Sequence, residues 1–333
     1  RNEQSAKGGM MDASQLHAPV MRDECLELLR PALEHEDSTY VDCTLGMAGH
    51  ACAVLAAFPK AHLVGIDRDR AALELARERL MREGFEGRFT LVHTTYDQIE
   101  GALAQARRGK ADGILMDLGL SSFQIDTRER GFAYSADAPL DMRMNPDGDS
   151  LTAADILNTW SEQDIANILY RYGEEKFSRR IARTIVSERA SDPFERSPQL
   201  VSAIERSLPA KSRHSGGHPA KRTFQALRIA VNEELDILRS ALDNALEALT
   251  PGGRLVIESY HSLEDRMVKE AFVEASSSKA PEGLPVDLAQ FAPDFSLVKR
   301  GAFKASAREQ ETNPRSASVR LRAIERTTPP EIS

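Results

Sequence analysis

The amino-acid sequence predicts an α/β protein in which a mostly parallel, Rossmann-like sheet is interrupted by an all-helical insertion. Four short apolar segments in the first 120 residues alternate with helical patterns, which is typical of a doubly wound sheet. After residue 119 the alternation stops, and helical patterns follow one another without a strand between them. Two late apolar segments also lack a helix between them, which predicts a hairpin at the sheet edge with one antiparallel strand.

The first four predicted strands are continuous apolar segments, as expected of strands buried on both faces of a parallel sheet. The fifth follows a Thr-Pro-Gly-Gly turn at 250–253, and the last two form the late hairpin. The predicted strands are 39–43, 62–67, 89–93, 113–118, 254–259, 295–299 and 319–325.

The segment 146–222 carries the predicted helical insertion. Ser161 begins a capping-box pattern, Ser197-Pro198 begins a later helix, and Pro209 ends it. Apolar residues at every third or fourth position over 224–249 predict one long helix facing the core. We therefore assign 1–145 and 223–333 to the α/β core and 146–222 to an inserted domain.

Composition excludes several classes of protein. A chain of 333 residues with no apolar segment near the roughly 20 residues of a membrane span is not expected in a membrane. Residues 1–11 lack the apolar segment of a signal peptide and are expected to be disordered. The three cysteines (Cys25, Cys43, Cys52) are too few for a disulfide framework or zinc site. These features favour a reducing cytoplasm and no bound metal.

Charge is distributed unevenly along a chain whose net charge is −8. Residues 176–222 contain eleven basic residues against four acidic ones, whereas 137–175 is rich in acid. This pattern predicts either a polyanionic partner for the insertion or an ordinary solvated helix surface.

Three features at predicted strand ends indicate a nucleoside-cofactor site. The loop after the first strand contains Gly46 and Gly49, which permit a tight turn and close approach of a ligand. Asp67 ends the second strand, where a carboxylate can accept hydrogen bonds from both hydroxyls of a ribose. Asp117 ends the fourth strand, near the expected reactive end of the cofactor. Each feature alone also has a structural explanation, as a turn or a helix cap.

The cofactor could be NAD or S-adenosylmethionine, because both contain the adenosine that Asp67 would bind. The loop lacks the G-x-G-x-x-G spacing expected beneath a pyrophosphate, and the late hairpin is typical of methyltransferase sheets. The pattern therefore favours a methyltransferase, with an NAD-dependent oxidoreductase as the alternative.

Motifs along nearly the whole chain resemble the RsmH (MraW) family, which methylates N4 of a cytidine in the decoding region of 16S ribosomal RNA. They include Asp42-Cys-Thr-Leu-Gly-Met-Ala-Gly-His50, Met116-Asp-Leu-Gly-Leu-Ser-Ser122, Arg222-Thr-Phe-Gln-Ala226 and His261-Ser-Leu-Glu-Asp-Arg266. The resemblance implies a class I methyltransferase core with a helical insertion, S-adenosylmethionine as cofactor, and 16S rRNA within the small ribosomal subunit as partner. It further implies that the cofactor pocket is lined by Ala48, Gly49, His50, Asp67, Tyr96, Asp117 and Gln124.

Two positions depart from the family pattern. The family usually has Gly-Gly-His where this chain has Ala48-Gly49-His50, so the loop must accommodate a Cβ atom. It usually has Pro where this chain has Phe123, which removes a fixed φ angle beside Gln124.

Methylation of an aromatic amine needs in-line alignment and acceptors for the amine protons. Asp117 and Asp141 are the candidate acceptors, with Ser122 as a hydrogen-bonding neighbour and His261 facing the base. The alternatives are that Asp141 caps a loop or pairs with Arg143, and that His261 packs beside Tyr260.

The target base must leave its stack to reach the methyl group. Basic residues of the insertion are the candidates to hold the RNA backbone meanwhile. A non-catalytic RNA-binding assembly factor with a vestigial pocket remains an alternative, and the oligomeric state is open, with a homodimer as one option. The candidate RNA-binding residues are Arg180, Arg183, Lys211, Arg213, Lys221 and Arg222.

Overall fold

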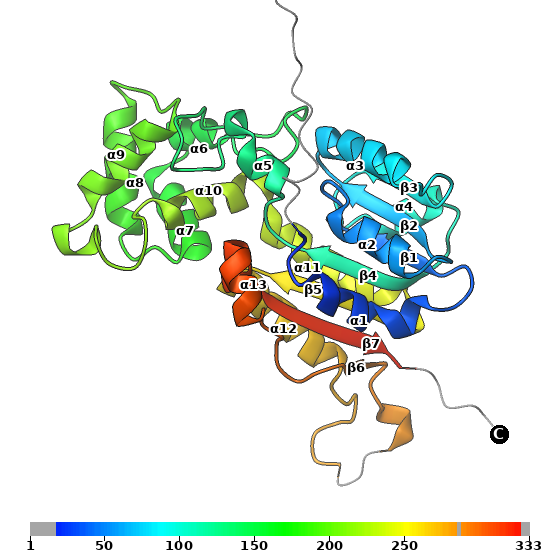
Figure 1. Ribbon diagram of the computed structural model, residues 1–333. Helices are drawn as coiled ribbons and strands as arrows, with labels where there is room; N and C mark the ends of the chain where they lie inside the picture. The colour runs from blue at the N-terminus through cyan, green and yellow to red at the C-terminus, as the bar shows by residue number, and fades with distance from the viewer. Residues whose placement is uncertain (1–17, 285–287, 328–333) are drawn as a thin grey trace, which may run out of the picture.

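The computed structural model describes residues 18–284 and 288–327; the extension at 1–11 that the sequence predicts to be disordered lies outside the described residues. A seven-stranded sheet has the order β3-β2-β1-β4-β5-β7-β6 (Figure 1). The strands are β1 (Thr39–Asp42), β2 (His62–Asp67), β3 (Phe89–His93), β4 (Ala111–Asp117), β5 (Leu249–Ser259), β6 (Phe295–Leu297) and β7 (Arg320–Arg326).

The sheet confirms the mostly parallel fold and the late hairpin. Strands β1 to β5 pair in parallel, whereas β7 runs antiparallel to both β5 and β6. The antiparallel strand is thus β7, one position in from the edge strand β6. Strand β5 begins at Leu249, earlier than predicted, because Leu249 pairs with Ala111 across an irregularity in the β4–β5 register.

Helices cover both faces of the sheet. Side chains alternate between the faces: Tyr40 packs against α1 (Arg22–Leu33), α2 (Gly49–Ala57) and α3 (Arg70–Arg82), whereas Val41 faces the opposite layer. That layer contains α4 (Ile99–Gln105), α11 (Glu234–Ala248) and α12 (Ser262–Ala275). Both clusters are almost completely buried, as expected for a sheet covered on two sides.

A third apolar cluster belongs to the helices drawn in green at the left of Figure 1. Ser161 and Pro198 stand at helix starts as expected, with Ser161 accepting a hydrogen bond from the backbone of Asp164. The cluster extends from Phe132 to Val231, and the domain limits 146 and 222 stay a prediction. The helices are α6 (Ala153–Thr159), α7 (Glu162–Gly173), α8 (Ser178–Arg189), α9 (Ser197–Ser207) and α10 (Lys221–Asn232).

Short elements connect these layers. Helix α5 (Ser122–Asp126) follows β4, and α13 (Ala307–Thr312) precedes β7. The 3-10 helices are η2 (Arg128–Arg130), η3 (Ala210–Ser212), η4 (Ala289–Phe291) and η5 (Pro314–Ala317).

The prediction of one long helix over 224–249 is wrong. The chain breaks at Glu233, whose φ of 51° is left-handed, and this residue separates α10 from α11. Asn232, just before the break, donates to the carbonyl of Met142 and accepts from the amide of Met144, both at 2.8 Å. Helix α10 therefore packs with the helical insertion, while α11 packs on the sheet.

Candidate active site

A cavity of about 1510 Å³ opens at the carboxyl ends of the parallel strands, next to α5 and α10. This is the position where open α/β sheets bind ligands. Ten of the residues predicted from the sequence line it: Gly46, Gly49, His50, Asp67, Tyr96, Asp117, Ser122, Gln124, Lys221 and His261.

The carboxylate of Asp67 holds the loop after β1 in place. Its Oδ2 accepts from the amide of Gly46 at 2.8 Å, and its Oδ1 accepts from the amide of Asp69 at 2.9 Å. Gly46 has a φ of 54°, a conformation in which glycine avoids the strain of a Cβ atom. Burial raises the pKa of Asp67 to about 6. Each carboxylate oxygen keeps a lone pair with which to accept a ribose hydroxyl.

Ala48 does not line the cavity, contrary to the expectation from the resemblance. Its side chain is fully buried, and its φ of 62° places it in the left-handed region just before α2. That conformation explains why glycine suits this position. At Gly49, a Cβ atom would lie 2.9 Å from the side chain of Pro19, so this glycine permits close packing at the rim.

Gln124 reaches the cavity even though Phe123 replaces the proline of the family pattern. A capping box fixes α5: Ser121 Oγ accepts from the Gln124 amide at 3.1 Å, and Gln124 Oε1 accepts from the Ser121 amide at 3.2 Å. Gln124 Nε2 also donates to Asp69 at 3.4 Å. These bonds position Gln124 without the fixed φ angle of a proline.

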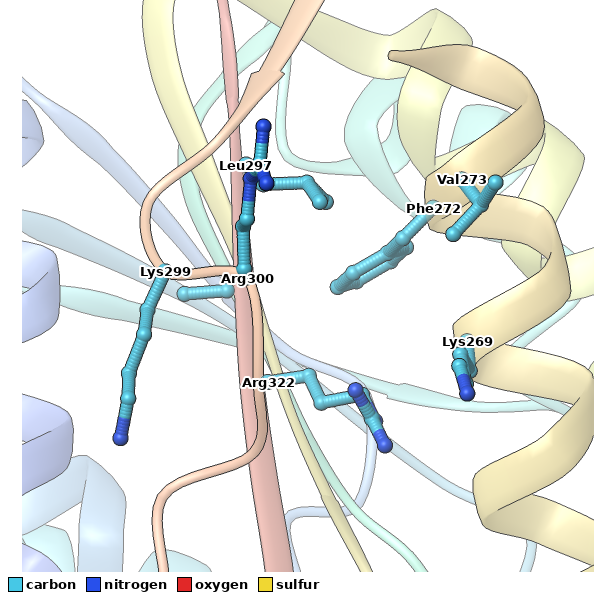
Figure 2. A pocket seen from close by; sticks show the side chains of 8 residues that line it. Lys269, Phe272, Val273, Leu297, Lys299, Arg300 and Arg322 are labelled. Atoms are coloured by element: carbon cyan, nitrogen blue, oxygen red, sulfur yellow. The ribbon is translucent and has the colours of Figure 1, made fainter. Parts of the chain in front are cut away.

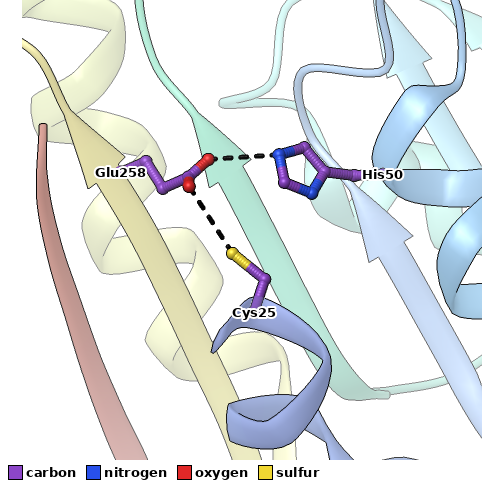
Figure 3. A group of neighbouring side chains, drawn as sticks. All are labelled: Cys25, His50 and Glu258. Carbon is purple, nitrogen blue, oxygen red and sulfur yellow. Dashed lines mark hydrogen bonds and ion pairs between the residues drawn. The ribbon is translucent and has the colours of Figure 1, made fainter. Parts of the chain in front are cut away.

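Asp117 lies in a cluster of ionisable groups at the ends of β4 and β5. Its Oδ1 accepts from the hydroxyl of Tyr260 at 2.6 Å, and its Oδ2 lies 3.6 Å from His50 Nε2. The same nitrogen lies 3.2 Å from Glu258 Oε2, an ion-pair distance without hydrogen-bond alignment. Figure 3 shows the two carboxylate oxygens of Glu258 directed toward different partners, one toward His50 and the other toward Cys25. The Cys25 thiol donates to Glu258 Oε1 at 3.6 Å.

The buried cluster separates the protonation states of its members. Burial raises the pKa of Glu258 well above its ordinary value, and repulsion by Asp117 adds to this effect. Burial would lower the pKa of His50, but Glu258 and Asp117 raise it well above its usual range. Burial also opposes ionisation of Asp117, yet the neighbouring imidazole of His50 and the hydrogen bond from Tyr260 lower its pKa below the ordinary value. Asp117 is therefore the carboxylate of this cluster that stays charged near neutral pH.

Sequence reasoning missed Glu258, Tyr260, Cys25 and Arg315. The available signal for Glu258 was a carboxylate directly after the apolar segment 255–257. Arg315 comes from η5, and its guanidinium donates to Ser122 Oγ at 2.7 Å on the cavity wall. Nothing local in the sequence connects these two residues.

Cys25, His50 and Glu258 also present their ligand atoms within 4.8 Å of one another. The thiol hydrogen bond and the imidazole–carboxylate pair account for these contacts without an ion. The absence of a metal stays a prediction. All three cysteines are free and buried.

The structure corrects the place of Asp141. Its carboxylate pairs with Arg143, at 2.9 Å to Nε and 3.0 Å to Nη2, and also accepts from the Arg143 amide. It does not line the cavity, so its position favours the structural alternative, a loop held by an ion pair. His261 does line the cavity, with Nε2 at 3.1 Å from Glu264 Oε1 and Nδ1 capping α12.

Among the candidate RNA-binding residues, only Lys221 lines the cavity; the others lie on exposed surface of the helical insertion. Several have local partners. Arg183 lies 3.8 Å from Glu162, Arg222 donates to the carbonyl of Glu174, and Arg180 lies over the ring of Phe177. Within the part of the chain that the structure describes, no helix has the length and apolarity to cross a membrane.

The sheet order, with β7 antiparallel, and a cavity bounded by Asp67 and Asp117 define a class I methyltransferase. The chain belongs to the MraW methylase family, whose pattern it matches over residues 14–327. Its cofactor is S-adenosylmethionine.

Two relatives share the name ribosomal RNA small subunit methyltransferase H. The protein of Mycobacterium avium (strain 104) is 55% identical over 325 residues, covering 95% of this chain and 83% of the relative. The protein of Nocardioides sp. is 55% identical over 313 residues, covering 94% of this chain and 97% of the relative. An rRNA methylase structure from Streptococcus thermophilus aligns at 11% identity and a TM-score of 0.41, over 92% of this chain and 94% of that one.

Proposed function

We propose that this protein transfers a methyl group from S-adenosylmethionine to the exocyclic N4 amine of a cytidine in the decoding region of 16S rRNA. The names of the two relatives support small-subunit rRNA as the substrate. The observation that carries the proposal is a charged Asp117 on the wall of a cavity large enough for a cofactor and a base.

The residues around the cavity fit an adenosyl cofactor. Asp67 offers carboxylate oxygens to a ribose, and Gly46 lets the backbone approach the ligand. Gln124 and Tyr96 line the cavity near the same loop and contribute polar groups and apolar surface. When bound, the cofactor supplies an activated methyl group, so the chain needs no covalent nucleophile.

The chain must then orient the amine and accept its proton. Asp117 can accept a hydrogen bond from the N4 amine, because its carboxylate is ionised and partly exposed, at 28% of the side chain. Its charge also stabilises the positive charge that develops on the amine as the methyl arrives. Tyr260 donates a hydrogen bond to this carboxylate, and His50 lies 3.6 Å from it. Ser122 and His261 line the cavity and complete the polar wall.

RNA recognition is assigned to the helical insertion, residues 146–222. Its exposed Arg180, Arg183, Lys211, Arg213 and Arg222, with Lys221 at the cavity, support contacts to phosphates while the target base leaves its stack. We propose the small ribosomal subunit in the cytoplasm as the setting of the reaction. A homodimer is compatible with this proposal and is not needed for the site.

The test uses small ribosomal subunits from cells that lack this enzyme, with S-adenosylmethionine labelled in the methyl group. Digestion of the RNA should yield labelled N4-methylcytidine. Asp117→Ala is expected to reduce the rate at least about 100-fold, the lower range for loss of a positioned acid–base group. The control is Asp243→Ala, which removes an exposed carboxylate on α11 and should leave the rate unchanged.

Label on a different atom or nucleoside would refute the cytidine assignment. An Asp117→Ala variant that turns over at the wild-type rate would remove Asp117 from the reaction. Binding of subunits without any transfer by the wild-type protein would instead favour the non-catalytic assembly factor. The methylase family match favours a methyltransferase over an NAD-dependent oxidoreductase.

A further inference from the structure

The C-terminal part of the chain carries a concentration of positive charge that differs from the rest of the molecule. Residues 299–322 contain seven basic and two acidic side chains, in a protein whose net charge is −8. Of the seven, Arg322 pairs with Asp265, at 2.8 Å. For the other six, the structure has no carboxylate within ion-pair distance among the described residues. Such a segment is not balanced by its own surroundings.

Part of this charge is gathered around a shallow hollow beside the sheet edge. Figure 2 shows Lys269 on α12 to one side, Lys299 and Arg300 after β6 on the other, and Arg322 of β7 between them. Phe272 and Leu297 form apolar parts of the lining, and no acidic side chain contributes to it. The hollow encloses only about 10 Å³, too little for a small molecule. Its shape suits a surface contact with a polyanion.

Further basic residues lie along β7 and its preceding loop, between the hollow and the active-site cavity. Arg320 pairs with Ser259 at the carboxyl end of β5, and Arg322 lies two residues further, on the same face of β7. Helix α12 begins directly after His261, which lines the cavity, and Lys269 follows eight residues later, about 12 Å along the helix. Arg315 lies on the cavity wall itself. The basic strip, as we name it, consists of Arg315, Arg320, Lys269, Lys299 and Arg300; Arg322 lies among them but is neutralised by Asp265.

We propose that the basic strip binds the sugar-phosphate backbone of the substrate RNA as it leaves the active-site cavity. Arginine and lysine are the residues that most often contact phosphates, and such contacts fix the position of the RNA without reading its sequence. The helical insertion lies on one side of the cavity and the strip on the other, so the RNA is held from two sides. This inference rests on the proposed function for its partner, an RNA strand, but not on which base is methylated.

The test compares Lys299→Gln/Arg300→Gln with a matched control, Arg107→Gln/Lys110→Gln. The control removes the same charge from exposed residues just before β4, at the opposite end of the strands from the cavity. Binding to small ribosomal subunits lacking the modification is measured between 50 and 200 mM KCl. Each phosphate contact contributes a slope of about 0.7 in log affinity against log salt for single strands. The slope of the strip variant should therefore be smaller by about 1.4. Between 50 and 200 mM KCl, its loss of affinity should be about sevenfold smaller than the loss of the wild type.

Unchanged slopes in the strip variant, or an equal change in the control, would overturn the proposal. Affinity for S-adenosylmethionine is measured in parallel and should match the wild type, which shows that the variant is folded. The outcomes of the two proposals are separable. Label on a base other than cytidine would refute the proposed function while leaving the altered salt slope intact.

Discussion

Asp67 shows how burial turns a binding residue into a pH-sensitive one. One of its oxygens accepts a backbone hydrogen bond from Gly46, in the loop after β1, and the other accepts one from Asp69; burial nevertheless raises its pKa to about 6. An ionised carboxylate accepts hydrogen bonds on both oxygens, whereas a protonated one must use one oxygen as a donor. The residue that orders the loop therefore changes its bonding capacity close to physiological pH.

We predict that affinity for S-adenosylmethionine falls as the pH drops through 6. Because of the raised pKa, Asp67 becomes protonated below about pH 6. The protonated form can no longer accept hydrogen bonds from both ribose hydroxyls. At pH 5, one unit below this pKa, only about a tenth of the Asp67 side chains are ionised. The affinity should therefore be about tenfold below its value at pH 7.5. Calorimetric titration at the two pH values measures it. In Asp67→Asn the affinity for S-adenosylmethionine should be low and independent of pH. If the affinity of this variant still fell toward low pH, the effect would belong to another group.

At the scale of elements, close approaches of backbone decide where helices can pack. Gly173 ends α7, and a Cβ atom there would lie 2.5 Å from the carbonyl oxygen of Arg222 and 3.2 Å from Ala226 Cβ on α10. These two helices are central to the apolar cluster of the insertion. Local sequence marks the end of a helix at this position, but the contact with α10 depends on residues about 50 positions away.

Gly173→Ala is therefore expected to destabilise the protein by about 1–3 kcal/mol, because an added methyl group forces α7 away from α10. The matched substitution is Gly101→Ala within α4, where a Cβ atom meets nothing within 4 Å. That change should stabilise by about 0.5–1 kcal/mol through the lower entropy of the unfolded chain. Urea denaturation compares both variants with the wild type. A Gly173→Ala protein as stable as Gly101→Ala would show that the two helices are free to separate.

Across the whole molecule, charge is arranged around the cavity although the net charge is negative. Basic residues of the helical insertion are exposed on one side, and those of the basic strip lie on the other. Internal ion pairs neutralise part of the insertion's charge, as Arg206 does with Glu188 and Arg196 with Asp137. Lys211 and Arg213 have no such acidic partner among the described residues. These unpaired basic residues attract a polyanion toward the cavity region.

Lys211→Gln/Arg213→Gln is predicted to weaken RNA binding without affecting the chemical step. The KM for small ribosomal subunits should rise about tenfold at low salt, since two phosphate contacts are lost, while kcat at saturating RNA stays within about twofold. Steady-state methyl transfer measures both constants, with Arg107→Gln/Lys110→Gln as the reference for the charge change alone. A fall in kcat with unchanged KM would place these residues in the reaction rather than in RNA binding.

The sequence by itself determined the class of fold, and it predicted a site at the strand ends, where the structure has a cavity. Short-range patterns were sufficient because each parallel strand is a short apolar segment, and because the motifs around Asp67 and Asp117 stand directly at strand ends. The same reasoning placed the late hairpin correctly. It failed at Glu233, where the apolar periodicity continues through a left-handed residue and carries no glycine or proline to mark the break.

Only the tertiary structure decided which groups meet. Cys25 and Glu258 are 233 residues apart, and they come together because α1 packs against β5. Arg315 and Ser122 are 193 residues apart, and they meet only because η5 packs beside α5. The pKa values in the cluster follow from that burial and cannot be read from residue types. The periodicity of a sequence shows which face of a helix or strand is apolar. Which element packs against that face depends on long-range contacts.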